Sequence, residues 1–161
     1  HLAREALTHP ATGFIGCEVF SGGIAKMVQQ IEAERIANVR LFTDDALKLL
    51  LELPDASLAG VYLLYPDPWP KTRHHKRRFV QRDNLDVLAR LMRPGAELRL
   101  ATDDPSYLPW MVEHACLHPA FEWLAQGPAD WRDRPADWPG TRYEQKMLAG
   151  HKPVFLRLRR R

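Results

Sequence analysis

The sequence predicts a doubly wound, Rossmann-like α/β fold with a mostly parallel sheet, and three observations lead to that class. Short apolar runs alternate along the chain with segments whose apolar residues recur at helical spacing. The run at residues 61–65 (VYLLY) is apolar on both faces, as expected for a central parallel strand that is covered on two sides. A length of 161 residues with 45% hydrophobic and 27% charged residues is typical of one globular domain with its own core.

The elements are expected to alternate from the first residues onward. Residues 1–5 have the composition of a helix interior, although the chain does not begin with Met, so a preceding segment is expected. Strands are expected at 13–19, 39–43, 61–65, 97–101, 121–124 and 154–158. Helices are expected after Gly22-Gly23, after Asp44, around residues 85–92 and after Pro105.

The end of the chain departs from this alternation. No helix long enough for a parallel crossover separates the last two strands, so an antiparallel pairing at a sheet edge is predicted. Residues 125–140 are rich in Pro, Asp and Trp and are interpreted as one long ordered loop. We expect Trp131 and Trp138 to attach this loop to the body of the protein rather than to stack on bases.

Composition excludes several classes of protein. No apolar run approaches the roughly 20 residues of a membrane-spanning helix. Cys17 and Cys116 lie within apolar patterns without metal-ligand spacing, which predicts buried free thiols, no metal site and a reducing cytoplasm. The net charge of +3 is informative only where the cations gather.

Acidic residues follow four of the expected strands, at the edge where ligands bind in open α/β sheets. Glu18 ends an apolar strand, where a carboxylate needs hydrogen-bond donors such as the hydroxyls of a ribose. Asp44 and Asp104 are read as helix N-caps, which leaves Asp45 to face the ligand crevice. Asp67 and Asp103 follow the next two strands.

The most informative stretch is residues 65–81 (YPDPWPKTRHHKRRFVQ). Three prolines stiffen the backbone around Asp67 and Trp69. Cations and histidines follow directly: Lys71, Arg73, His74, His75, Lys76, Arg77 and Arg78. A run of charge is usually only a solvated face, but this one adjoins a rigid acidic turn at the expected ligand edge. That position favours binding of a polyanion through its phosphates.

The same stretch resembles the signature of the bacterial tRNA (guanine-N7)-methyltransferases. Four other segments agree with that family in order, and together they extend the resemblance over essentially all the residues: Gly16–Val19, Asp45-Ala46, Ala101–Asp103 and Thr141–Glu144. The glycine-rich cofactor loop of the family and the acid before it have no counterpart here. We expect them upstream of His1, so that residues 1–161 form a single methyltransferase domain without its first strand and loop.

The resemblance implies an S-adenosyl-L-methionine (SAM)-dependent methyltransferase fold and formation of N7-methylguanine in tRNA, at the variable-loop guanine, in the cytoplasm. Glu18 is then expected to bind the SAM ribose, Asp45 to lie near the adenine amino group, and Asp67 to lie between cofactor and base as the catalytic residue. Asp103 is expected to accept from the guanine N1–H and amino group. The tRNA-binding set is completed by Lys71, Arg73, His74, His75, Lys76, Arg77, Arg78, Thr141, Arg142, Tyr143 and Glu144. For Glu144 a structural salt bridge is the alternative.

Two rival interpretations remain open. A non-catalytic RNA-binding domain with a decayed methyltransferase fold explains the basic run, but not the acids Glu18, Asp45 and Asp67 after successive strands. A nicotinamide-dependent dehydrogenase explains a ribose-binding acid, but not a rigid acidic turn followed by cations. The sequence does not distinguish a monomer from a homodimer.

Overall fold

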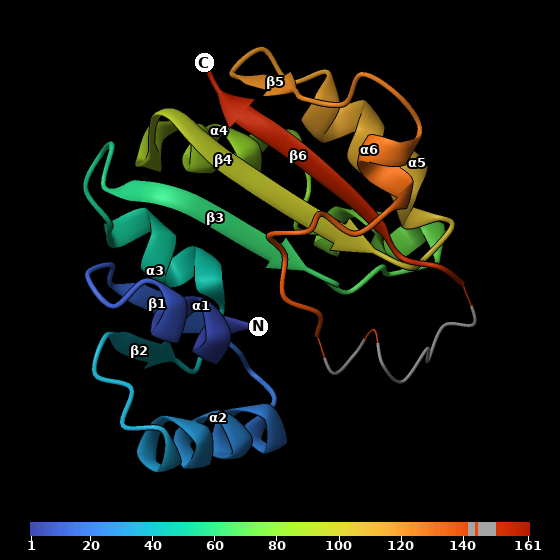
Figure 1. The fold of residues 1–161 in the computed structure, drawn as a ribbon. Helices are drawn as coiled ribbons and strands as arrows, with labels where there is room; N and C mark the ends of the chain where they lie inside the picture. The colour runs from blue at the N-terminus through green and yellow to red at the C-terminus, as the bar shows by residue number, and fades with distance from the viewer. Residues whose placement is uncertain (142–143, 145–150) are drawn as a thin grey trace. The chain divides into compact units, whose positions relative to one another are not determined.

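A computed structural model describes residues 1–141, 144 and 151–161 (Figure 1). Its contacts divide the chain into two compact units. The first, called unit 1, contains residues 1–52 and 139–141, and the second, called unit 2, contains residues 53–138 and the described part of 142–161. Each unit is described by itself.

Unit 1 is a small α/β unit in which helices and strands alternate. Its elements are α1 (Leu2–Thr8), β1 (Phe14–Cys17), α2 (Ser21–Ala33), β2 (Val39–Phe42) and α3 (Ala46–Glu52). The two strands are parallel and pair in register from Phe14 opposite Val39 to Cys17 opposite Phe42. The helix expected at the start of the chain and both strands are therefore confirmed.

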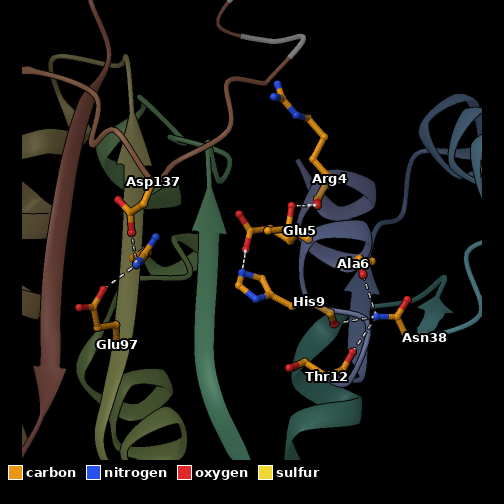
Figure 2. Close-up of polar contacts among 10 residues, drawn as sticks. Arg4, Glu5, Ala6, His9, Thr12, Asn38, Glu97 and Asp137 are labelled. Atoms are coloured by element: carbon orange, nitrogen blue, oxygen red, sulfur yellow. Dashed lines mark hydrogen bonds and ion pairs between the residues drawn. The ribbon is translucent and has the colours of Figure 1, made fainter.

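The core of unit 1 is built from small side chains on α1. Ala3 and Ala6 are buried with Ile36 and Val39, and the partly buried side chains that pack on them are Leu2, Phe14, Met27, Ile31 and Leu41. The turn after α1 is closed by Asn38, whose Nδ2 donates to the carbonyls of Ala6 (3.0 Å), His9 (3.1 Å) and Thr12 (2.8 Å) (Figure 2). One side chain thus satisfies carbonyls that the end of a helix leaves unpaired.

Unit 2 holds the larger sheet. Its strands are β3 (Leu58–Leu64), β4 (Met92–Thr102), β5 (Phe121–Trp123) and β6 (Val154–Arg160), in the order β3-β4-β6-β5. β3 and β4 are parallel, whereas β6 runs antiparallel to both β4 and β5 (Figure 1). The α/β class and the antiparallel C-terminal pairing are confirmed, and β6 enters between β4 and β5.

The helices of unit 2 are η1 (Thr72–Arg77), α4 (Arg82–Leu91), α5 (Tyr107–Met111), the π-helical turn η2 (Val112–Cys116) and α6 (Ala129–Arg132). The expected fourth helix corresponds to α5 and η2 together. Asp104 begins it as expected, because its Oδ1 accepts from the backbone N–H groups of Ser106 (2.8 Å) and Tyr107 (3.0 Å). Leu85, Leu88 and Leu91 of α4 are fully buried, which is why this amphipathic segment is held in place.

The strands of unit 2 also carry an ion-pair network. Arg99 of β4 donates to Glu97 (2.9 Å) and to Asp137 (2.7 Å) (Figure 2). Arg157 of β6 donates to the same Glu97 carboxylate at 2.8 Å. Trp138 lies against this network and packs edge-on to Phe155, with ring centroids 5.3 Å apart. With 2% of its surface exposed, Trp138 attaches its loop to the sheet as predicted.

Two expectations about the fold were wrong in detail. The long loop at 125–140 contains the short helix α6. Cys17 is exposed rather than buried, because it ends β1 on a side that the described residues of the structure do not cover. Cys116 is half-buried, and burial raises the pKa of its thiol to about 12.

Among the described residues, no helix combines the length and apolarity needed to cross a membrane.

Candidate functional site

In unit 1, Glu18 directly follows β1. Its backbone N–H donates to the Phe42 carbonyl (3.1 Å), and its Oε1 accepts from the Phe20 N–H (2.9 Å) just before α2. A Cβ added to Gly23 would lie only 3.3 Å from Glu18 Cγ. The absence of a side chain at Gly23 therefore provides the space that the Glu18 side chain occupies. The carboxylate is therefore held between the end of β1 and the first turn of α2, and it can accept hydrogen bonds from hydroxyl groups.

The acidic pair after β2 differs from its expected arrangement. Asp45 rather than Asp44 caps α3, because its Oδ1 accepts from the Leu47 N–H (3.0 Å). The helix starts at Ala46, one residue later than expected, which makes Asp45 the residue before its first turn. Asp44 instead pairs with Lys48 (2.7 Å), whose hydrogen bond lowers the pKa of this exposed carboxyl. Asp45 is exposed, but one of its two carboxylate oxygens is already used to cap α3.

In unit 2, Asp67 lies in a tight turn after β3. The turn begins at Tyr65, whose N–H donates to the Ala101 carbonyl of β4 (2.9 Å). Tyr65 (φ 53°) and Trp69 (φ 43°) both adopt the left-handed region, which costs a non-glycine residue about 1–3 kcal/mol. Asp67 is exposed between these two strained positions. Its carboxylate is thus presented by a backbone with little freedom.

The basic segment continues from this turn into the 3-10 helix η1. Lys71, Arg73, Lys76 and Arg77 are exposed, whereas His74 and His75 are half-buried. The Arg77 guanidinium lies 4.9 Å from the centre of the Trp69 ring, and the His74 ring meets Trp69 edge-on at 5.8 Å. The exposed cations therefore gather beside the Asp67 turn, on side chains that phosphate groups can reach.

Arg78 departs from the expectation for this run. Only 2% of its surface is exposed, and its Nε donates to the Pro68 carbonyl at 2.7 Å. Arg78 therefore does not share the exposure of its neighbours, because η1 ends at Arg77 and the next residue turns into the protein. The signal in the sequence is the apolar pair Phe79-Val80, which marks where the chain re-enters the core.

Asp103 follows β4 and is half-buried. β3 and β4 are parallel neighbours, with Leu64 opposite Ala101, so the Asp67 turn and Asp103 leave the sheet at the same edge. The Asp67 turn, the basic segment that continues from it and Asp103 thus all follow the carboxyl ends of neighbouring parallel strands, where ligands bind in open α/β sheets.

The C-terminal motif is described only in part. Arg142 and Tyr143 lie outside the described residues. Glu144 pairs with Arg134 at 3.3 Å and is mostly buried, which matches the structural alternative considered for it. Thr141 is half-buried. In the described part of the chain, no group of His, Cys, Asp and Glu side chains could hold a metal ion.

The alternating elements and antiparallel last strand define the Rossmann-like methyltransferase fold. It is similar to an rRNA methylase from Streptococcus thermophilus (TM-score 0.56, 12% identity, 92% of this chain and 73% of that one). It is also similar to a precorrin-6y C5,15-methyltransferase from Geobacter metallireducens (TM-score 0.57, 15% identity, 94% and 70%). A putative methyltransferase from Streptococcus mutans, in complex with SAH, gives a TM-score of 0.55 at 11% identity over 92% and 76%. At these identities the likeness concerns the fold alone.

Sequence relatives define the family. A family profile described as "Putative methyltransferase" matches residues 1–156. The chain is 51% identical to a tRNA (guanine-N(7)-)-methyltransferase of Rhodospirillum rubrum, with 100% of this chain and 64% of the relative covered. The corresponding enzyme of Paramagnetospirillum magneticum is 52% identical, with 100% and 68% covered. The chain belongs to the tRNA (guanine-N(7)-)-methyltransferase family, and it spans about two thirds of the length of these relatives.

Proposed function

We propose that this chain is part of a SAM-dependent enzyme that methylates N7 of a guanine in tRNA, in the cytoplasm. The observation that carries the proposal is the arrangement in unit 2, where Asp67 in its strained turn adjoins four exposed cations and Asp103. Membership of the family agrees with it, since the relatives bear the name of this activity. The variable-loop guanine is the expected target.

The chemistry explains why no general base is needed. N7 of guanine has an in-plane lone pair and no hydrogen, so the nucleophile is ready as it stands. The enzyme must align N7 with the methyl carbon and the sulfonium of the cofactor, which is catalysis by positioning. The purine gains positive charge as the bond forms, and a fixed carboxylate beside it stabilises the transition state. We assign this role to Asp67 and the guanine N1–H and amino edge to Asp103.

The cofactor assignments rest on unit 1. SAM supplies an electrophilic methyl group when bound. Glu18 fits the ribose, because its carboxylate is an acceptor held at the start of α2 with space left by Gly23. Asp45 fits the adenine amino group through its Oδ2, since Oδ1 caps α3. Asp67 is assigned to the boundary between cofactor and base.

The tRNA assignments follow from exposure. Lys71, Arg73, Lys76 and Arg77 are proposed to bind phosphates, with His74 and His75 beside them. The assignment of Thr141, Arg142, Tyr143 and Glu144 to the substrate side rests on the family resemblance alone. The test is methyl transfer from labelled SAM to an unmodified tRNA transcript by the full-length polypeptide. Label in N7-methylguanosine after digestion to nucleosides is the expected result. Tight tRNA binding without any transferred label would favour the non-catalytic RNA-binding alternative.

A further inference from the structure

We propose that the buried Arg78 is a positioning residue that locks the Asp67 turn to the loop after β4, so that the two acid-bearing segments of unit 2 keep one geometry. The inference deepens the proposed function and rests on it, since Arg78 acts on methyl transfer through Asp67. It removes Arg78 from the group of phosphate-binding cations to which its neighbours Lys76 and Arg77 belong.

The first link joins Arg78 to the Asp67 turn. Its Nε donates to the Pro68 carbonyl at 2.7 Å, and Pro68 directly follows Asp67. The turn contains two strained residues, Tyr65 and Trp69, which keep their conformation only if surrounding contacts hold it. A charge-assisted hydrogen bond in a buried setting is a contact of that kind.

The second link joins Arg78 to the loop that carries Asp103. Its Nη2 donates to Ser106 Oγ at 3.3 Å, and this hydroxyl donates to Asp104 Oδ1 at 2.7 Å. The Asp104 N–H in turn donates to Thr102 Oγ1 at the end of β4 (3.1 Å). One guanidinium therefore spans the segments that follow two neighbouring parallel strands.

Burial explains why an arginine is required. The guanidinium lies 4.9 Å from the ring centres of both Tyr107 and Trp110, so aromatic faces replace the water it has lost. Tyr107 also accepts from the Val80 N–H (3.2 Å), which fixes the chain just after Arg78. A lysine would keep the charge, but it lacks the planar fork that reaches a carbonyl and a hydroxyl at once.

The decisive variant is Arg78→Lys in the full-length polypeptide. We expect single-turnover methyl transfer at saturating SAM and tRNA to fall by about tenfold or more, because small misplacements of reacting groups are costly. Hydrogen exchange of the backbone at residues 65–71 should speed up. tRNA affinity and its salt dependence should stay at the wild-type level, whereas Arg77→Gln should weaken binding and flatten the salt slope.

Arg93→Lys is the matched control. Arg93 also donates through Nε to a backbone carbonyl, that of Ala56 at 3.1 Å, but it lies at the opposite end of β4. This variant should transfer methyl groups at the wild-type rate. Arg78→Lys with unchanged transfer and exchange would overturn the inference. A reduced salt slope like that of Arg77→Gln would also overturn it, by making Arg78 a phosphate contact.

Two further variants separate the possible failures. If Arg78→Lys does not fold, Ser106→Ala removes only the second link and should still slow transfer; a wild-type rate there would overturn the inference. In an Asp67→Ala background, Arg78→Lys should cause no additional loss, whereas losses that multiply would show that Arg78 does not act through Asp67. If Asp67→Ala alone transfers normally, the proposed catalytic role of Asp67 is rejected. The rate of hydrogen exchange at residues 65–71 in Arg78→Lys then tests by itself whether Arg78 holds the turn in place.

Discussion

Asp67 is the residue on which the proposed chemical step depends most. Asp67→Ala should leave the fold and most of the tRNA affinity intact, because phosphate contacts dominate binding and Asp67 is exposed. Single-turnover transfer should fall by about a hundredfold or more, the scale of one lost electrostatic stabiliser. Asp67→Asn separates the two roles of the carboxylate. If charge matters, the amide should be nearly as slow as alanine, and if only hydrogen bonding matters, it should retain appreciable activity.

Glu18 carries the corresponding prediction for the cofactor. Glu18→Ala should weaken binding of SAM and SAH by roughly tenfold or more, because a hydrogen bond to a charged group contributes about 1.5–3 kcal/mol. Calorimetry on the folded variant measures the change. Glu52→Ala, at the end of α3, is the control with the same loss of charge, and it should bind as wild type. Unchanged affinity in Glu18→Ala would reject the ribose assignment.

At the residue scale, the sequence predicted where the acidic residues lie better than it predicted which contacts each side chain makes. Acids that follow parallel strands must lie at one sheet edge, so Asp67 and Asp103 were correctly grouped within unit 2. Asp45 rather than Asp44 caps α3 because the helix starts one residue later than the pattern predicts, and helix ends commonly differ by one or two residues from a sequence-based prediction. The burial of Arg78 was missed because the eight consecutive polar residues 71–78 carry no periodic signal of which side chain faces inward.

At the scale of elements, Asn38 is the side chain that closes α1. Asn38→Ala removes the donor to the carbonyls of Ala6, His9 and Thr12 and should destabilise unit 1 by about 1–3 kcal/mol. Asn38→Asp should be worse, since a carboxylate is repelled by the same carbonyls. Hydrogen exchange at the His9 amide, which bonds the Glu5 carbonyl, reports the opening of α1. Exchange as slow as in wild type would show that the three bonds do not stabilise the helix.

Apolar patterns determined most elements, and long-range pairing determined the rest. Every expected strand is present, because runs such as residues 61–65 are too apolar to remain in solvent. The insertion of β6 between β4 and β5 is not encoded locally; it depends on Leu156 and Leu158 pairing opposite Leu100 and Leu98. The π-helical turn η2 likewise has no signature in the spacing of its residues.

At the scale of the whole molecule, the family resemblance of one motif was more informative about function than the composition of the chain. A net charge of +3 alone does not identify a nucleic-acid-binding protein. The arrangement of that charge supports the proposed tRNA binding, because Lys71, Arg73, Lys76 and Arg77 are exposed together, whereas Arg99 and Arg157 pair with Glu97 on the sheet. Counting cations could not separate these two groups, since the pairs of Arg157 with Glu97 and of Arg99 with Asp137 join residues far apart in the sequence.

The stability of the molecule should decrease toward acid in two windows. His118 is buried, and its Nδ1 accepts from the Ala120 N–H (3.2 Å), while its Nε2 lies 3.2 Å from Asp86 Oδ1. Burial lowers the pKa of His118 below 6.5, against the opposing effect of Asp86 and with the help of Arg82 and Arg160. Because the unfolded chain then binds more protons, the free energy of unfolding should fall as the pH decreases below 6.5.

A second window belongs to Glu97. Burial alone would raise the pKa of its carboxyl, but hydrogen bonds from Arg157 and Arg99 outweigh burial and lower it below 4.5. Its stabilising contribution is therefore complete above pH 4.5 and is lost as the pH falls further.

Urea unfolding across the pH range measures both effects. His118→Asn should reduce the pH dependence of the free energy of unfolding only in the upper window, and Glu97→Gln only in the lower one. The comparison with wild type isolates each residue, because the other histidines and carboxyls are common to all three proteins. An upper window that persists unchanged in His118→Asn would assign the loss of stability near neutral pH to another histidine.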